Sequence, residues 1–147
     1  WFVHDRRLSV SQAVSSIVLL LFLGVVFAST VFTRMPKGRS FELKLFWSWW
    51  EVFMNHDKEL LKENLLNCIL LVPMGMLLPL VFKRKVMLRK AFAAGLLVSA
   101  IIETLQLVLC RGLFEWDDMI HNGLGCLFGC LIMNKIVEWK FENGTNK

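Results

Sequence analysis

The sequence lacks the cysteine and histidine patterns that would build a thiolate or imidazole metal centre, and it lacks the pattern of a nucleophilic triad. None of its four cysteines forms a C-x-x-C pair, and no histidine or further cysteine completes a set around Cys126 and Cys130. We therefore interpret the cysteines as small packing residues. No well-placed histidine accompanies Ser99, so a serine-based triad is poorly supported. We accordingly assign no metal ligand and no cofactor.

Charge is nearly missing from long stretches of the chain, and these stretches are apolar. Hydrophobic residues make up 56% of the sequence, whereas soluble domains are usually about 45–50% apolar. The excess falls in four runs, residues 10–32, 64–82, 91–110 and 118–137, each close to the roughly 20 residues that cross a bilayer. The sequence therefore predicts an all-α, polytopic membrane protein with four transmembrane helices, in one domain over residues 1–147. The first run is too long for a cleaved signal peptide, so we expect a retained helix.

The basic residues favour one orientation of these helices. Residues 83–90, KRKVMLRK, contain five basic residues and no acidic ones. Because loops rich in lysine and arginine stay cytoplasmic, we expect this loop and both termini inside, with residues 34–63 and 111–117 outside. This topology also explains the net charge of +5, so we expect membrane lipids rather than nucleic acid as partners.

The longest connection, residues 34–63, is rich in aromatic residues. Within residues 41–54 the apolar positions fit both a helical and an alternating pattern, which leaves the secondary structure open. Tryptophan, which is enriched at membrane–water interfaces, occupies three of the four positions 47–50. We therefore expect a Trp-rich amphipathic segment on the outer surface between the first two transmembrane helices. A lid or an aromatic platform for a ligand is the alternative.

Three of the four predicted spans carry a pair of polar residues on one helical face. The pairs are Asn64 with Asn67, Glu103 with Gln106, and Asp118 with Asn122. With the orientation above, all three pairs lie in the outer half of the membrane. Ionisable residues at such a depth are costly and tend to face a bundle interior or an aqueous cavity. We therefore expect Glu103 and Asp118 to line one outward-facing polar pocket.

This pocket has several possible roles. Arg111, in the turn between the last two spans, is the expected cation, within salt-bridge reach of Glu103 or Asp118. The polar groups could form a clasp that locks the bundle, a ligand site, or a divalent cation site. Glu103 and Asp118 are the candidate general acid or base, and the candidate ligand-binding residues are Asn64, Asn67, Gln106, Arg111, Asp117 and Asn122.

The order of these motifs resembles the VanZ-like family of membrane proteins. The matching blocks are N-x-x-N-x-x-x-x-x-P-x-G from Asn64, S-x-x-x-E-x-x-Q from Ser99, Arg111, D-D-x-x-x-N from Asp117 and G-x-x-x-G from Gly125. The last block also predicts close contact of Gly125 and Gly129 with another helix. The blocks cover residues 64–129, and the N-terminal third carries no motif of the family.

This resemblance implies a small multi-pass protein of the bacterial cytoplasmic membrane, in a family whose founding member is associated with teicoplanin resistance. We expect the pocket to bind an amphipathic or lipid-linked envelope ligand, such as a lipoglycopeptide or a lipid-linked cell-wall precursor. The alternative is an intramembrane hydrolase or transferase acting on such a lipid.

Three positions depart from the family pattern. Leu71 stands where phenylalanine is frequent, and Glu115 stands where aspartate is frequent. His121 falls where an apolar residue is usual. It could pair with Asp117 or Asp118, or simply touch solvent or a neighbouring helix.

Overall fold

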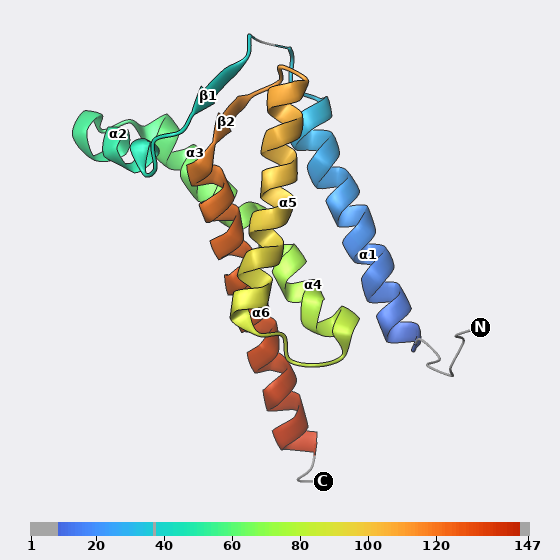
Figure 1. Ribbon diagram of the computed structural model, residues 1–147. Coiled ribbons are helices and arrows are strands. Elements are labelled where there is room, and N and C mark those ends of the chain that lie inside the picture. The colour runs from blue at the N-terminus through green and yellow to red at the C-terminus, as the bar shows by residue number, and fades with distance from the viewer. Residues whose placement is uncertain (1–8, 37, 145–147) are drawn as a thin grey trace.

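The computed structural model describes residues 9–36 and 38–144, with side chains up to residue 139. Its elements follow in the order α1 (Val10–Phe27), the π-helical turn η1 (Ala28–Phe32), β1 (Ser40–Glu42), α2 (Trp47–Asn55), α3 (Lys58–Leu70), α4 (Val72–Phe82), α5 (Leu88–Val108), β2 (Leu113–Glu115) and α6 (Trp116–Gly144). Figure 1 shows an elongated helical bundle with the two strands at one end. The prediction of a helical membrane protein is confirmed, apart from this small sheet.

Four helical segments are long and apolar enough to cross a membrane: Val10–Phe32, Lys58–Phe82, Leu88–Val108 and Trp116–Trp139. The second begins earlier than the sequence predicted, because the side chain of Asp57 accepts hydrogen bonds from the backbone N–H groups of Glu59 and Leu60, each at 3.0 Å. Such a cap satisfies donors that the first helical turn leaves free. This span breaks into α3 and α4 at Leu71, two residues before Pro73, which has no N–H to donate.

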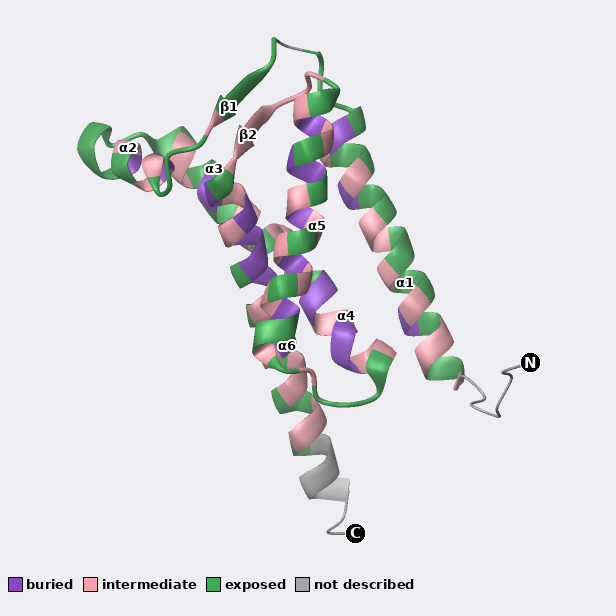
Figure 2. Ribbon diagram, viewed as in Figure 1, coloured by how far each residue is buried: buried purple, intermediate pink, exposed green. Residues whose placement is uncertain are grey.

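Helix α6 is the centre of the bundle. It packs against α3, α4 and α5, while α1 packs against α4. In Figure 2 the buried residues gather on α4, α5 and α6, whereas α1 is exposed or half-buried along most of its length. The exposed side chains of α1 are apolar, as Leu20 and Leu21 illustrate, which suits a helix surrounded by lipid.

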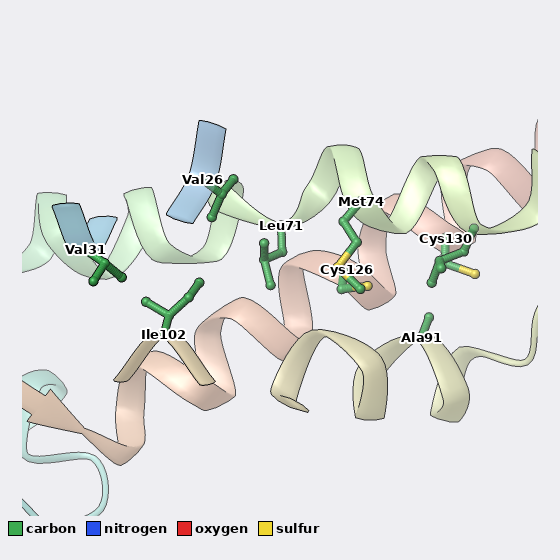
Figure 3. Close-up of a cluster of buried hydrophobic side chains, with 9 residues drawn as sticks. Val26, Val31, Leu71, Met74, Ala91, Ile102, Cys126 and Cys130 are labelled. Atoms are coloured by element: carbon green, nitrogen blue, oxygen red, sulfur yellow. The ribbon is translucent and has the colours of Figure 1, made fainter. Parts of the chain in front are cut away.

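A small apolar core holds these helices together. Its buried side chains, most of them labelled in Figure 3, are Val26, Val31, Leu71, Met74, Leu78, Ala91, Ile102, Cys126 and Cys130. The two cysteines are free and fully buried among aliphatic neighbours. They act here as small packing residues, as the sequence predicted.

The close contact predicted for Gly125 and Gly129 is confirmed. A Cβ atom added at Gly125 would lie 2.1 Å from the carbonyl oxygen of Cys68, and one at Gly129 would lie 2.0 Å from that of Val72. Gly75 of α4 faces the Cys126 carbonyl oxygen of α6 in the same way, at 2.0 Å. Only hydrogen atoms fit between these backbones, so the glycines set the separation of α6 from α3 and α4.

The segment before α2 and the segment before α6 are joined by a two-stranded parallel sheet, which the all-α prediction did not include. Ser40, Phe41 and Glu42 of β1 pair with residues 113–115 of β2. The ambiguous segment 41–54 thus divides, because its start finds a strand partner and its Trp-rich part forms the helix α2. The partner strand lies about seventy residues away, so no local pattern could reveal the pairing.

Candidate functional site

A cavity of about 850 Å³ lies at the end of the bundle that carries β1 and β2. Its wall is formed by the segment after the first span, by α3, by the turn leading into β2 and by the start of α6. We call it the outer pocket, after the side of the membrane on which the sequence predicts it to lie. Four of the predicted site residues line it: Asn64, Asn67, Arg111 and Asp118.

The asparagines and Asp118 bring α3 and α6 together at the pocket wall. Asn64 is buried, and its side-chain amide donates a hydrogen bond to the hydroxyl of Ser48 at 3.2 Å. Asn67 lies one turn further along α3, close to the carboxyl group of Asp118. The meeting of the polar faces of these two spans follows the sequence-based expectation.

Glu103 lies behind the pocket wall rather than in it. Its side chain is only 2% exposed, and its Oε2 atom accepts a hydrogen bond from the backbone N–H of Glu115 at 3.1 Å. The prediction that Glu103 and Asp118 both line the cavity is therefore wrong for Glu103. Strand β2 intervenes, so Glu103 supports the wall through Glu115, which does line the pocket.

Gln106 and Asn122 lie outside the pocket and connect helices. The Gln106 amide donates to the carbonyl oxygen of Thr30 at 3.0 Å, which joins α5 to the first span. The Asn122 amide donates to the hydroxyl of Ser99 at 2.9 Å, which joins α6 to α5. Both residues are buried, so these contacts have the geometry of a polar clasp within the bundle.

Asp117 of α6 also lies outside the pocket wall, where its side chain contacts the first residues of α2. Its carboxylate accepts hydrogen bonds from the backbone N–H groups of Phe46 and Ser48, at 2.6 and 3.2 Å, and from the Ser48 hydroxyl at 2.7 Å. Phe46 has a left-handed backbone and offers α2 no side-chain cap of its own. Asp117 therefore caps α2 from a distant part of the chain. This contact accounts for its burial without a ligand.

The cation of the site is different from the one the sequence suggested. Arg111 donates to the carbonyl oxygen of Phe32, and among the described residues it forms no ion pair within 4 Å of Glu103 or Asp118. The salt-bridge prediction is therefore wrong. Phe32 ends the first span, where helical carbonyl groups lack intrahelical partners and attract cationic donors. Arg34, which follows Phe32 by two residues, is the basic side chain whose positive charge lies near the carboxyl groups of Glu103 and Asp118.

The predicted site residues did not include several polar residues of the pocket wall. They are Arg34, Ser40, Glu63 and Glu115. Arg34 immediately follows an apolar run and looked like an ordinary flanking charge. It enters the wall because the β1–β2 pairing draws residues 34–36 and 38–42 alongside the turn that contains Arg111.

Glu115 has an unusual protonation equilibrium. Burial, together with the nearby carboxyl group of Asp118, raises its pKa from 4.5 to about 7, although a hydrogen bond from the Trp47 indole opposes the shift. That hydrogen bond joins Trp47 Nε1 to Glu115 Oε1 at 2.8 Å. Near neutral pH the Glu115 carboxyl group can therefore either accept or donate a proton.

His121 lies between the Trp-rich helix and Asp118. The indole Nε1 of Trp49 donates a hydrogen bond to His121 Nε2 at 2.7 Å, and His121 Nδ1 is 4.0 Å from Asp118 Oδ1. His121 is only 4% exposed, so of the alternatives left open by the sequence, it contacts the neighbouring helix α2 rather than solvent, and its Nδ1 atom makes no hydrogen bond to Asp118. No three acidic, histidine or cysteine side chains among the described residues are arranged to hold a metal ion.

The relationship of this chain to known proteins agrees with its motifs. Residues 13–137 match the model of the family described as VanZ/LLP1. The chain belongs to the VanZ/LLP1 family. In this VanZ/LLP1 protein, the match also covers the first span and the loop that carries Arg34, a part of the chain in which the sequence analysis found no motif of the family. Comparison with curated proteins and with solved structures finds no match. Family and four apolar helices together identify a VanZ-like membrane protein.

Proposed function

We propose that this VanZ/LLP1 protein binds an amphipathic or lipid-linked envelope ligand in the outer pocket, and thereby contributes to resistance against teicoplanin-type glycopeptides. The observation that carries the proposal is the mixed lining of this pocket. Arg34 and Arg111 share the lining of a cavity of about 850 Å³ with the acidic residues Glu63, Glu115 and Asp118. Convergent polar groups of this kind, in a cavity of this size, are typical of small-molecule sites.

An apolar side of the pocket suits the lipid part of such a ligand. Leu60, Leu66 and Met35 belong to its lining. The side chains of Leu66 and its neighbour Leu65 are 54% and 50% exposed. An acyl or polyprenyl chain could lie along these side chains, while its polar head reaches the arginines and carboxyl groups.

The charge of the opposite end supports an outward orientation of the pocket. Residues 83–90 connect α4 to α5 at the end of the bundle away from β1 and β2 (Figure 1). The positive-inside rule assigns this loop to the cytoplasm, in a multi-pass protein of the bacterial cytoplasmic membrane with both termini inside. The terminal residues 1–8 and 145–147 lie outside the described part of the chain.

Helix α2 suits the same orientation. Trp50, Phe53 and Met54 are 59%, 70% and 60% exposed, whereas Trp47 and Trp49 hold Glu115 and His121 through their indole N–H groups. An amphipathic helix with an aromatic exposed face is typical of a segment that lies at a membrane surface. On the outer surface, α2 would bring a bound amphipathic ligand close to the pocket.

The second candidate function is an intramembrane hydrolase or transferase that acts on a lipid-linked precursor. It is favoured by two neighbouring carboxyl groups in the pocket wall, Asp118 and Glu115, and by the pKa of about 7 of Glu115. A carboxyl group that titrates near neutral pH suits general acid–base catalysis. Glu103 would then orient Glu115 through the backbone rather than meet the substrate.

Binding of teicoplanin and of its deacylated form to the protein in nanodiscs tests the proposal. We expect the acylated form to bind, and Arg34→Gln and Asp118→Asn to weaken its binding about tenfold or more, because hydrogen bonds to charged groups are worth about 1.5–3 kcal/mol. Arg39→Gln is the matched control, since Arg39 lies in the same loop outside the pocket lining. Equal binding by all variants, or unchanged teicoplanin susceptibility of cells carrying them, would contradict the proposal.

A second measurement separates the two candidate functions. The protein is incubated with a lipid-linked cell-wall precursor, and the lipid is then examined by mass spectrometry. A binding protein leaves the precursor intact. Conversion of the precursor that is lost in Asp118→Asn or Glu115→Gln, but kept in Arg39→Gln, would establish the enzyme instead.

A further inference from the structure

A second cavity, of about 410 Å³, lies at the opposite end of the bundle, where α4 connects to α5. We call it the basic pocket. Its apolar side includes Leu78, Phe82 and Ala94, and its rim carries the basic residues Arg84, Lys85 and Lys90. The mixture is unlike that of the outer pocket, because no acidic residue lines this cavity.

The loop that forms the basic pocket is held in place by α6. The Asn134 side chain accepts a hydrogen bond from the Val86 N–H at 3.2 Å and donates one to the Val86 carbonyl oxygen at 2.8 Å. Lys85 forms an ion pair with Glu138. These contacts fix the loop before any ligand arrives, which reduces the entropic cost of binding.

Two cations of the rim remain without an acidic partner. Among the described residues, neither Arg84 nor Lys90 forms an ion pair. The Arg84 guanidinium lies over the ring of Phe82, 5.9 Å from its centroid. The N-terminus of α5 adds positive potential beside them, because this 21-residue helix begins at Leu88 without a side-chain cap.

We propose that the basic pocket binds the phosphate headgroup of an anionic phospholipid. Arg84 and Lys90 would contact the phosphodiester, and the acyl chains would run along the apolar surface of α4 and α5. Phe82 and Leu97 expose 52% and 62% of their surfaces there. Basic pockets between transmembrane helices at the cytoplasmic side are suited to anionic headgroups. This site is independent of the function proposed for the outer pocket.

The volume and position of the basic pocket favour a lipid over a soluble anion. A cavity of about 410 Å³ has room for a glycerophosphate headgroup. Its lining residues end one apolar span and begin the next, so the cavity lies at the level where lipid headgroups meet the bundle. Apolar lining residues such as Leu78 and Ala94 would contribute nothing to the binding of free phosphate, whereas they can contact the acyl chains of a lipid.

The test compares two double variants that remove the same charge. Arg84→Gln/Lys90→Gln changes residues of the pocket rim, whereas Lys83→Gln/Arg89→Gln changes residues of the same loop and helix start that do not line it. Dissociation constants for phosphatidylglycerol, phosphatidylcholine and inorganic phosphate are measured by native mass spectrometry in a neutral detergent. We expect wild type to prefer phosphatidylglycerol, and the rim variant to bind it about tenfold or more weakly than the control variant.

Four outcomes would overturn the proposal. Equal losses in both double variants would show a general surface charge effect, and equal binding of phosphatidylcholine would show acyl-chain adhesion alone. If inorganic phosphate binds as tightly as phosphatidylglycerol, the pocket is a site for free anions rather than for a lipid. If a folded rim variant binds phosphatidylglycerol as wild type does, Arg84 and Lys90 do not contact the headgroup. If the rim double variant does not fold, the single change Lys90→Gln is compared with Lys83→Gln by the same criteria.

Discussion

Replacement of Gly125 by alanine probes one of the three close glycine contacts between α6 and the helices α3 and α4. The new Cβ atom would lie 2.1 Å from the carbonyl oxygen of Cys68 and 3.0 Å from its carbon atom, whereas carbon–oxygen contacts between helices are normally about 3.3–3.6 Å. The obstacle is backbone, which cannot rotate aside as a flexible side chain can. Helix α6 must therefore move away from α3 by about 1 Å.

This displacement has a cost that can be set against a matched control. A gap of about 1 Å forfeits roughly a quarter to a half of each dispersion contact it opens, and overpacking by extra methyl or methylene groups typically costs about 1–3 kcal/mol. We expect Gly125→Ala to lose about that much stability, and Gly125→Leu to lose more. Gly24→Ala in α1 is the control, because nothing lies within 4 Å of its added Cβ. Its effect is limited to helix propensity, which favours alanine by up to about 1 kcal/mol.

Unfolding in mixed micelles of mild detergent and sodium dodecyl sulfate measures these differences. The helical signal is followed as the fraction of sodium dodecyl sulfate rises, and the midpoints of wild type, Gly125→Ala and Gly24→Ala are compared. The order expected is Gly125→Ala below wild type, with Gly24→Ala at or above it. If Gly125→Ala and Gly24→Ala unfold at the same midpoint, the glycine contact does not set the separation of these helices.

Three further predictions concern helix α2, the protonation of Glu115 and the orientation of the protein in the membrane. Asp117→Ala should lower the free energy of unfolding by about 1–2 kcal/mol, in the range of a lost helix cap, and should expose α2 to limited proteolysis. Glu51→Ala, a change within α2 itself, should not have this effect, and equal cleavage of both variants would contradict the capping role. Because the pKa of Glu115 is about 7 in the folded protein and 4.5 as its ordinary value, the folded state holds this proton more tightly, and stability should fall as the pH rises from about 4.5 through about 7. Glu115→Gln should make this decline shallower in thermal unfolding between those pH values, and an unchanged slope would refute the assignment. In intact cells, with the native cysteines of the protein replaced, a membrane-impermeant thiol reagent should label a cysteine introduced at Ser40 but not one introduced at Lys85. The reverse pattern would show that the pocket we call outer faces the cytoplasm.

The sequence by itself determined the membrane architecture and the close helix contacts. A transmembrane helix needs about 20 consecutive apolar residues, because its backbone must satisfy its own hydrogen bonds in lipid. That requirement is local, so the four spans could be read from composition alone. The spacing of Gly125 and Gly129 was likewise sufficient to predict their close contact with another helix, since two small residues one turn apart form a flat face that another backbone can approach.

The sequence placed four residues of the outer pocket, Asn64, Asn67, Arg111 and Asp118, but only the tertiary structure decided which other polar residues line it. Asp117 and Phe46 are 71 positions apart, and Arg111 and Phe32 are 79 apart. The pairing of β1 with β2 brings Arg34 into the pocket wall, places Glu115 between Glu103 and the cavity, and leaves Asp117 to cap α2. Helical spacing reports the face on which a residue lies, but a hydrogen bond between distant segments depends on how the loops meet. The pocket is built where loops meet, so its exact membership is a property of the fold rather than of any local pattern.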